Sequence, residues 1–434
     1  MRYTRKSLYY ITSTLKYPFN ACLGKEVMLM TRIGNGISKG ENGFHAAKAA
    51  AEKAMEKLNG EKPDVAIVYS SLEYHLDDVY AGVKGVIGDV QLIGASSAGE
   101  FTESEVQEKS VAVSLIRSDS CQFFTSSVGD VKGNTYVRAQ EVLDGLPSEV
   151  DGFEHYSYIV LHDGLIGQGE DIVTNLSFLV HKGRQFSGGA AGDDLQFKAT
   201  YVMHNGTVLN NGLVVLMIAS KHKVGLGVEH GHEPVSDELE VTKAEENVLY
   251  TVNERPAWEV WKDSIREHAR EHEGVDVDAL EDPAKINELL LKYEMGLKLG
   301  EDRYKVRVPL SANMDDGSLN FGVKIFEGSR FSIMYSVKER QLESAREAAE
   351  RAKHHFDENN GGQATIAGAF VFDCVCRGLI LQEDFPQAIE NIKEVIGKET
   401  PLIGFETYGE VCKGEGDIFT GFHNTTTVVM ILPD

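Results

Sequence analysis

The sequence predicts an α/β protein with mixed β-sheets covered by helices, built from a repeated strand–helix–Gly-rich loop–strand unit and arranged as two packed halves. Helix-length and strand-length apolar patterns alternate along most of the chain. One sequence pattern, predicted to be a loop, occurs twice, as "LIGASSAGE" at 92–100 and as "LIGFETYGE" at 402–410. A related Gly-rich loop is predicted at 185–194, with the sequence "QFSGGAAGDD". Each loop follows a strand and a helix and precedes another strand, which is the pattern of a repeated unit.

The first unit is expected over residues 43–118. The run rich in Ala, Glu and Lys at 43–60 predicts a helix that ends at Asn-Gly, and the apolar run at 64–71 predicts a buried strand. A second helix through 74–88 leads into the loop at 92–100. The β-branched run at 109–118 then predicts the closing strand.

The second and third units repeat this order of elements. For the second we expect a strand at 156–164, a helix at 169–183, the loop at 185–194, and strands at 199–206 and 207–220. For the third we expect a strand at 367–378, a helix at 385–398, the loop at 402–412 and a strand at 425–434.

The region between the second and third units has a different pattern. Short strands are expected at 224–235 and 237–253, followed by an amphipathic helix at 256–273 that a proline opens. The run at 281–296 predicts another helix. A meander with an Asp-Asp-Gly turn and a long helix at 338–358 follow.

Composition and charge restrict the class of protein. A chain of 434 residues is long enough for two or three domains, and 42% apolar with 25% charged residues is ordinary for a soluble globular protein. The formal net charge of −24 repels polyanions, so we predict neither a nucleic-acid nor a membrane partner. Five scattered cysteines do not form a disulfide framework, which favours a reducing cytoplasm.

Two domain boundaries are predicted, one after the basic amino-terminal segment and one near 221–223. The basic segment 1–27 is predicted to be a poorly ordered tail or to precede a true start at Met28 or Met30, and a targeting segment is the less favoured alternative. The second boundary divides residues 28–434 into an amino-terminal domain at 28–222 and a carboxyl-terminal domain at 223–434.

Four stretches of the second half occur in a specific order: "GVEHGHEPVSDELEVTKAEENVLYTVNERPAWEVW", "DGSLNFGVKIFEGSRF", "VFDCVCRG" and "GFETYGEVCKGEGDIFTGFHNTT". Together they resemble the carboxyl-terminal half of FIST-domain proteins, including a Cys-x-x-Arg at Cys374–Arg377, a Gly-Glu at 409–410 and a His-Asn at 423–424. "LIGASSAGEF", "SGGAAGDDL" and "NGTVLNNGLVVLMI" resemble the matching amino-terminal half. The resemblance covers about residues 28–434.

This resemblance implies a sensory and signal-transduction protein that binds a small molecule. Amino acids are often proposed as ligands of the family, and a histidine kinase or a chemotaxis-type protein would be the signalling partner. One branch of the family is reported as a haem protein that senses nitric oxide. A haem- or metal-binding gas or redox sensor is therefore the alternative.

The expected ligand site lies where strands end in polar residues and Gly-rich loops follow. In open α/β sheets, ligands bind beyond the carboxyl ends of the strands, where glycines let backbone N–H groups approach them. With the residues that the family resemblance adds, the candidate ligand-binding set is Ser96, Ser97, His162, Asp163, Gly188, Gly189, Asp193, Cys374, Arg377, Gly409, Glu410, His423 and Asn424.

This set of residues suits a zwitterion. Arg377 could bind a carboxylate through two hydrogen bonds, and an acid such as Asp193 could bind an ammonium group. The structural alternative is that the glycines serve tight turns and that Arg377 forms a buried ion pair with Glu410. The sequence leaves both interpretations open.

Cysteine and histidine raise the question of a cofactor or a catalytic role. Cys374 and Cys376 would share one face of a strand, and with Cys412 and His423 they would offer four soft ligands for zinc or haem. Cys-x-Cys is not the usual zinc spacing, so we predict no resident cofactor, with haem as the minor alternative.

An enzyme is the third hypothesis. A thiol nucleophile needs a partnered base, and Cys374 with His423 is the one pair to consider. The chain has no Gly-x-Ser-x-Gly elbow, no Walker loop and no His-Glu-x-x-His. We therefore predict that the protein is not an enzyme.

Overall fold

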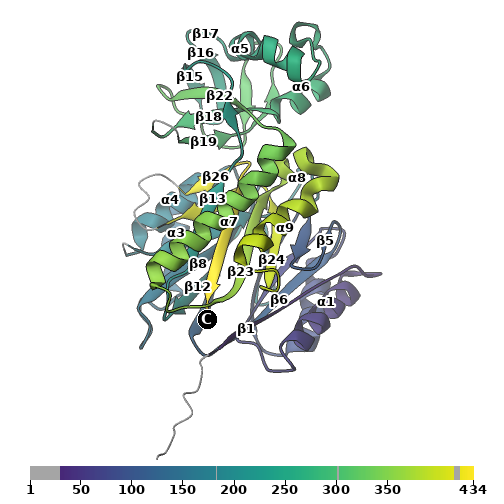
Figure 1. The fold of residues 1–434 in the computed structure, drawn as a ribbon, viewed down its shortest axis with the longest axis vertical. Coiled ribbons are helices and arrows are strands. Elements are labelled where there is room, and N and C mark those ends of the chain that lie inside the picture. The colour runs from purple at the N-terminus through teal and green to yellow at the C-terminus, as the bar shows by residue number, and fades with distance from the viewer. Residues whose placement is uncertain (1–29, 182, 301–302, 415–420) are drawn as a thin grey trace, which may run out of the picture.

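Three α/β units and one inserted domain make up the fold, which we describe from a computed structural model (Figure 1). The structure describes residues 30–181, 183–300, 303–414 and 421–434. The tail predicted at 1–27 lies outside these ranges. Within them, no helix is both long and apolar enough to span a bilayer.

The first unit runs from residue 31 to residue 118. It comprises β1 (Thr31–Ser38), α1 (Gly43–Lys57), β2 (Val65–Ser70), α2 (Leu76–Ile87), β3 (Gln91–Ser96), β4 (Glu100–Thr102), β5 (Val106–Gln107) and β6 (Val111–Ser118). In its sheet, β6 lies antiparallel between β1 and β2, and β2 pairs in parallel with β3. Helix α1 begins at the N-cap Asn42, whose side chain accepts a hydrogen bond from the amide of His45.

The second and third units repeat this sheet pattern. The second comprises β7 (Cys121–Val128), α3 (Thr135–Asp144), β8 (His155–His162), α4 (Gly169–Leu179), β9 (Gln185–Ala190), β10 (Val202–His204), β11 (Thr207–Leu209) and β12 (Leu213–Ser220). The third comprises β13 (Gly225–Glu229), α7 (Lys338–Asn360), β23 (Ile366–Cys374), α8 (Val375–Leu381), α9 (Phe385–Ile396), β24 (Leu402–Thr407), β25 (Glu410–Lys413), β26 (Phe422–His423) and β27 (Thr427–Pro433).

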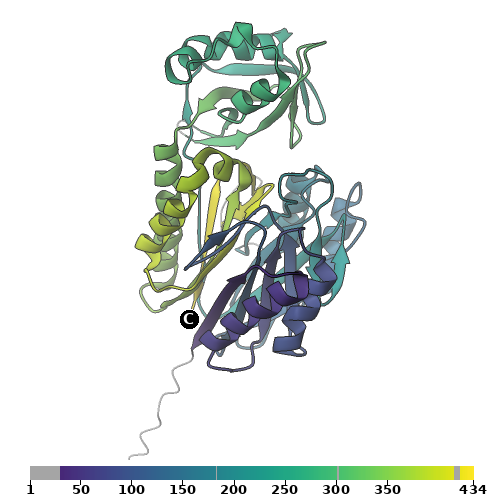
Figure 2. The ribbon, with the colours of Figure 1, turned by 90° about the vertical axis from the view of Figure 1, so that its right-hand side faces the viewer.

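Each unit donates two short strands to the sheet of another unit. Strands β4 and β5 of the first unit join the sheet of the third unit, where β4 pairs with β24. Strands β10 and β11 of the second unit join the sheet of the first unit, where β10 pairs with β3. Strands β25 and β26 of the third unit join the sheet of the second unit, where β25 pairs with β9. The exchange is cyclic, so every unit both gives and receives strands. Backbone hydrogen bonds therefore join the three units to one another. Figure 2 shows the units packed together below the inserted domain.

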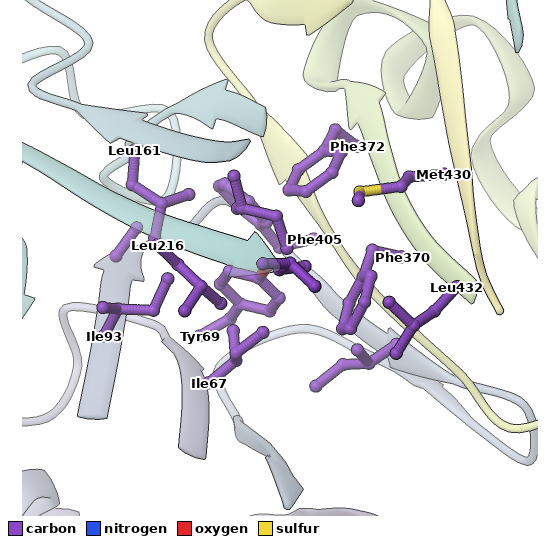
Figure 3. Packing of buried hydrophobic residues seen from close by; sticks show 14 of the residues in the cluster. Ile67, Tyr69, Ile93, Leu161, Leu216, Phe370, Phe372, Phe405, Met430 and Leu432 are labelled. Atoms are coloured by element: carbon purple, nitrogen blue, oxygen red, sulfur yellow. The ribbon is translucent and has the colours of Figure 1, made fainter. Parts of the chain in front are cut away.

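The inner faces of the three sheets enclose one apolar core. Figure 3 shows Ile67, Tyr69 and Ile93 of the first unit meeting Leu161 and Leu216 of the second and Phe370, Phe372, Phe405, Met430 and Leu432 of the third. The rings of Tyr69 and Phe405 stack with centroids 4.2 Å apart. Alternate residues of each strand point into this core, while the helices cover the outer faces.

Paired glycines bring the outer helices close to the sheets. A Cβ at Gly34 or Gly36 of β1 would lie 2.1 Å from a carbonyl oxygen of α1, and one at Gly225 or Gly227 of β13 would lie 2.2 or 2.0 Å from a carbonyl oxygen of α7. Each Gly-x-Gly pair thus permits an Ala-rich helix to pack directly on the strand. The Gly34-x-Gly36 pair, which is too short for a dinucleotide fingerprint, has this packing role.

The inserted domain separates β13 from α7 and stands at the top of Figure 1. It comprises β14 (Glu233–Pro234), β15 (Leu239–Glu245), β16 (Val248–Val252), β17 (Arg255–Pro256), α5 (Ala257–His272), the 3₁₀ turn Val277–Ala279, α6 (Pro283–Leu290), β18 (Tyr293–Lys298), β19 (Tyr304–Arg307), β20 (Pro309–Ala312), β21 (Leu319–Phe321) and β22 (Arg330–Tyr335). A separate core, centred on Trp258 and Trp261, stabilises it.

The predicted fold class is confirmed, because mixed sheets, outer helices and three copies of the repeated unit are all present. Several element predictions are wrong. The three stretches predicted as loops begin as strands, namely β3, β9 and β24, and the strand expected at 207–220 is divided into β11 and β12, which belong to different sheets. The strand expected at 367–378 ends at Cys374, and helix α8 follows, which places Arg377 one helical turn after its partner Asp373. The helix expected at 281–296 ends at Leu290, because Tyr293–Lys298 finds strand partners on both sides.

Candidate functional site

The three repeated loops hold one another in a ring where the units meet. The amide of Ala98 donates to the carbonyl of Glu406 at 3.2 Å. In the same way, the amide of Tyr408 donates to the carbonyl of Ala190 at 3.1 Å, and the amide of Gly192 donates to the carbonyl of Ser96 at 2.9 Å. These bonds align the loops residue by residue. Positions 96, 190 and 406 are equivalent, and so are positions 100, 194 and 410.

The repeated Gly-Glu motif has a structural role. Glu410 is fully buried and accepts hydrogen bonds from the hydroxyl of Thr407 at 2.5 Å and from the amide and hydroxyl of Thr426 at 3.1 and 2.9 Å. Glu100 accepts from Ser97 and from the amide and hydroxyl of Ser110 in the same manner. Each carboxyl group fixes the point at which the chain crosses into another unit's sheet.

Burial dominates the acid–base behaviour of these two groups. It raises the pKa of Glu100 to about 7 and the pKa of Glu410 to about 8, although the hydroxyl and amide donors act in the opposite direction. The counterpart in the second unit is Asp194, rather than the predicted Asp193. Asp194 accepts from the hydroxyl of Ser71 and the amide of Leu72.

Asp163 and Asp193, two predicted ligand-binding acids, hold in place the chain that follows β9. Asp163 accepts from the amides of Leu165 and Asn211 and from the side chains of Thr200 and Asn210. Asp193 accepts from three backbone amides at 197–199 and from the hydroxyl of Tyr408. Four donors on each carboxylate satisfy both oxygens within the protein.

Arg377 is fully buried and all three of its nitrogens donate to protein groups. Its Nε lies 2.8 Å from Oδ1 of Asp373, Nη1 lies 2.8 Å from the hydroxyl of Ser344 and also donates to the side chain of Gln341, and Nη2 lies 3.0 Å from the carbonyl of Gln341. The ion pair is with Asp373 rather than with the expected Glu410. These contacts favour the structural interpretation of Arg377.

The remaining predicted residues are divided between packing and backbone contacts. A Cβ at Gly188 or Gly189 would collide with Val160 or Thr407, so both glycines serve close packing. His162 lies 2.8 Å from the carbonyl of Asp163 through Nδ1, and Nε2 of His423 lies 3.1 Å from the carbonyl of Cys412. Gly409, at a φ of +158°, and Asn424 are buried beside these groups.

The cysteines do not form the predicted arrangement. Cys374 is the last residue of β23 and stands at the N-cap position of α8, whereas Cys376 lies inside that helix. The two thiols therefore do not share a strand face. Burial raises the pKa of the Cys374 thiol well above its usual value, which disfavours a thiolate. Across the described ranges, no three His, Cys, Asp or Glu side chains are placed to hold a metal ion.

A cavity of about 680 Å³ opens beside the loop ring, between α8 and the β4–β6 region of the first unit. Glu406 lies in its lining. The other lining residues are Lys39, Ala98, Val106, Gln107, Glu108, Lys109, Asp194, Leu195, Val375, Gly378, Leu379, Gln382, Glu383, Phe385 and Pro386. We call this cavity the Glu406 cleft. Such a volume suits a small organic ligand.

The carboxyl group of Glu406 is partly buried and has no hydrogen-bond or ion-pair partner among the residues that the structure describes. Two glycines leave space for it, since a Cβ at Gly378 would lie 2.6 Å from its Oε1 and one at Gly99 would lie 3.0 Å from its Cδ. Burial, followed by the charges of Asp373 and Glu100, raises the pKa of Glu406 well above its usual value. An added cation would stabilise its charged form.

The repeat itself marks Glu406 as an exception. The equivalent residues are Ser96, whose hydroxyl donates to the carbonyl of Gly192 at 2.6 Å, and Ala190, which is apolar. Sequence reasoning missed Glu406 because it compared the motif ends, Gly-Glu, and not the second position after Leu-Ile-Gly. An alignment of the loops alone would have found this acid.

The walls and rim of the Glu406 cleft have complementary chemistry. Val375, Leu379 and Phe385 supply apolar surface, and exposed ammonium groups of Lys39 and Lys109 stand at the rim, the latter 3.0 Å from Glu73. The lining of the cleft therefore combines the partly buried carboxyl group of Glu406, apolar side chains and two ammonium groups, together with the further carboxylates of Glu108, Asp194 and Glu383.

Fold and site define a three-unit α/β protein with one inserted domain and a cleft of ligand size. The FIST N domain family model matches residues 64–255 and the FIST C domain family model matches residues 257–413. The chain belongs to the FIST family, whose domains are in general sensory domains of signal transduction. The two matches divide inside the inserted domain. The division predicted at 222–223 stays a prediction.

Similarity to individual proteins adds little about chemistry. An uncharacterized protein of Methanocaldococcus jannaschii is 23% identical over 385 residues, which cover 82% of this chain and 70% of the relative. A cyanuric acid hydrolase from A. caulinodans matches 45% of this chain and 72% of its own with a TM-score of 0.27 and 10% identity. A second cyanuric acid hydrolase structure matches 93% of this chain and 99% of its own chain, with a TM-score of 0.30 and 9% identity. These TM-scores are too low to support an argument about fold or activity.

Proposed function

We propose that this protein is a cytoplasmic sensor that binds a small molecule, with amino acids as the leading ligand class, in the Glu406 cleft. One observation carries the proposal: a carboxyl group without a partner lies in a ligand-sized cavity, between two glycines that leave space for it. Buried polar groups in proteins are nearly always paired, so an unpaired one in a cavity indicates a missing partner.

A zwitterionic amino acid fits the charges of this cleft. Its ammonium group would pair with Glu406, which lowers the desolvation penalty of the carboxylate. Its carboxylate would face Lys39 and Lys109 at the rim, and its side chain would contact Val375 and Leu379. The expected residues Ser96, Ser97 and Gly409 contribute indirectly, because they build the loop ring that positions Glu406.

Signal transfer would use the composite nature of the cleft. Its lining comes from the first unit, from Asp194 and Leu195 of the second, and from α8 and β24 of the third. A ligand that contacts all three units stabilises the arrangement that it fits best. A histidine kinase or a chemotaxis-type protein is the partner class that we propose to read this change. The proposal includes no catalytic step and no resident cofactor.

The test is a thermal-shift screen of the purified protein against the amino acids and simple amines, followed by calorimetric titration of any stabilising compound. Glu406→Gln keeps the size of the side chain, removes its charge and should abolish binding. Glu399→Gln, an exposed acid near β24, is the matched control and should bind normally. Unchanged affinity in Glu406→Gln would exclude this cleft.

An absorption spectrum of the freshly purified protein tests the alternative. A Soret band, lost when His423 or Cys374 is replaced, would overturn the proposal in favour of a haem sensor.

A further inference from the structure

A second cavity, of about 430 Å³, lies where the inserted domain meets the third unit. Its lining comes from β13 and α7 of the third unit, from β19 of the inserted domain, and from the chain around β25 and β26. The lining residues are Leu226, Gly227, Val228, Glu229, His230, Leu299, Arg303, Tyr304, Lys305, Val306, Arg351, His355, Cys412, Gly414, His423 and Thr426. We call it the junction cavity.

Among the residues that the structure describes, the lining of the junction cavity is basic, although the whole chain carries a formal net charge of −24. Arg303, Lys305 and Arg351 line it, and Glu229 is the single carboxylate among its described lining residues. Three histidines line it as well. A local excess of cations in an acidic protein is not explained by overall composition, and concave basic surfaces concentrate anions.

Lys305 is the most buried of the cations, with 4% of its side chain exposed. It lies 3.3 Å from Glu170 at the start of α4, and the same carboxylate also binds Arg307, at 2.6 Å. Burial, followed by the charge of Arg307, lowers the pKa of Lys305 to about 7. An anion in the cavity would favour the charged form of this lysine.

Burial and nearby cations lower the pKa of two histidines that line the junction cavity. Burial and then the charges of Lys305 and Arg307 lower the pKa of His423 to about 3. Burial and then the charge of Arg351 lower the pKa of His230 to about 4. The two rings come from different parts of the chain, His423 from β26 and His230 from the residue after β13, and the cations that act on them differ.

We propose that the junction cavity binds the phosphate group of a small phosphorylated ligand, through Arg303, Lys305 and Arg351. Guanidinium groups bind phosphate oxygens through paired hydrogen bonds, and a buried ammonium group adds a point charge. The cavity is larger than one phosphate ion, and Leu226, Leu299 and Val306 supply apolar surface for an attached organic group. This site is separate from the Glu406 cleft and does not depend on the sensor proposal.

The ligand would also bridge two parts of the fold. Arg303 and Lys305 belong to the inserted domain, whereas Arg351 lies on α7 of the third unit. Binding would therefore increase the stability of the inserted domain's attachment, by an amount set by affinity and concentration.

The test is a calorimetric titration of the full chain with inorganic phosphate, in buffer whose ionic strength is held constant with chloride. We expect saturable binding and a higher unfolding temperature in phosphate than in chloride. Arg351→Gln should weaken binding about tenfold, as expected for the loss of one charge-assisted contact. Arg351 is 61% exposed, so its replacement should not unfold the chain.

Two further variants test whether the affinity for phosphate changes in the expected direction. Glu229→Gln removes the carboxylate that pairs with Arg351 and should tighten phosphate binding. Arg346→Gln, on the same helix but paired with Glu394 outside the cavity, should leave it unchanged. Binding that is equal in Arg351→Gln, Glu229→Gln and the control, or stabilisation that chloride reproduces, would overturn the proposal.

Discussion

Replacing Glu406 by Ala should make the ligand-free protein more stable at pH 8. The variant removes a carboxyl group that has no partner among the described residues, and Ala occupies the equivalent position 190 of the second unit. The site opens into a cavity, so water fills the vacated space and no empty void forms. A fully buried unsatisfied polar group costs about 1–3 kcal/mol, and because Glu406 is only partly buried we expect a gain of about 1 kcal/mol in the free energy of unfolding.

The gain should depend on pH in a definite direction. Burial raises the pKa of Glu406 in the folded state above its unfolded value. A carboxyl group of this kind destabilises the folded protein progressively as the pH rises from the unfolded pKa, near 4.5, through the folded pKa. The variant should therefore exceed the wild type clearly at pH 8 and lose most of this advantage at pH 4.5.

The assay is urea unfolding followed by far-UV circular dichroism at both pH values. Both tryptophans of the chain, Trp258 and Trp261, lie in the core of the inserted domain, so fluorescence reports that domain separately. Glu399→Ala, an exposed control, should change stability by less than about 0.5 kcal/mol. A gain that is absent at pH 8, or equal at both pH values, would refute the assignment of Glu406 as an unpaired buried acid.

Three further predictions concern the scaffold. Arg377→Met should lower the free energy of unfolding by about 3–5 kcal/mol, because it leaves Asp373 buried and unpaired, and Asp373→Asn in the same chain should restore part of the loss in urea unfolding. Gly378→Ala should abolish ligand binding to the cleft in calorimetry, since its Cβ would lie 2.6 Å from Glu406 Oε1, while the circular dichroism spectrum stays unchanged. Glu170→Gln should weaken the attachment of the inserted domain by about 1–3 kcal/mol, because it removes the carboxylate that binds both cations of β19, and hydrogen exchange in β19 should accelerate.

Local sequence was sufficient for many helices and strands of the repeated unit, but not for β1, β7 and α3 or for the way the units join. Helix α1 follows directly from an Ala-rich run, and strand β12 lies within the apolar run that predicted a strand at 207–220. The cyclic exchange of β4–β5, β10–β11 and β25–β26 depends on pairings between residues far apart in the chain. Short strands of two to four residues carry no periodicity from which such partners could be recognised.

Several residues predicted to bind the ligand lie in the loop ring beside the Glu406 cleft, but their polar groups are bound by other protein groups. Strong motif positions, such as Glu410 and Asp193, attracted a functional interpretation, and the structure shows that their carboxylates are saturated by protein donors. Burial explains this outcome, because a charged group that the fold needs must be paired within the protein. Glu406 was overlooked because its significance is visible only when equivalent positions of the repeat are compared.

The pseudo-symmetry of the fold separates scaffold from function. Where the units agree, as in the hydroxyl–carboxyl pairs of Ser97 with Glu100 and Thr407 with Glu410, the side chains fix strand exchange. The units differ at several places, and two of these bear on the cavities. One is position 406, which places an acid in the Glu406 cleft. The other is the connection between the first strand and the first helix of a unit.

That connection links the two candidate sites. In the first unit it is the short turn between β1 and α1, which contributes Lys39 to the rim of the Glu406 cleft. In the third unit the same connection, between β13 and α7, holds the whole inserted domain, which contributes Arg303 and Lys305 to the junction cavity. Both cavities therefore use equivalent connections of a scaffold whose repeated residues are already occupied by structure. A scaffold of this kind can gain a binding site only where one unit departs from the other two, and the acidic cleft and the basic junction cavity both lie at such departures.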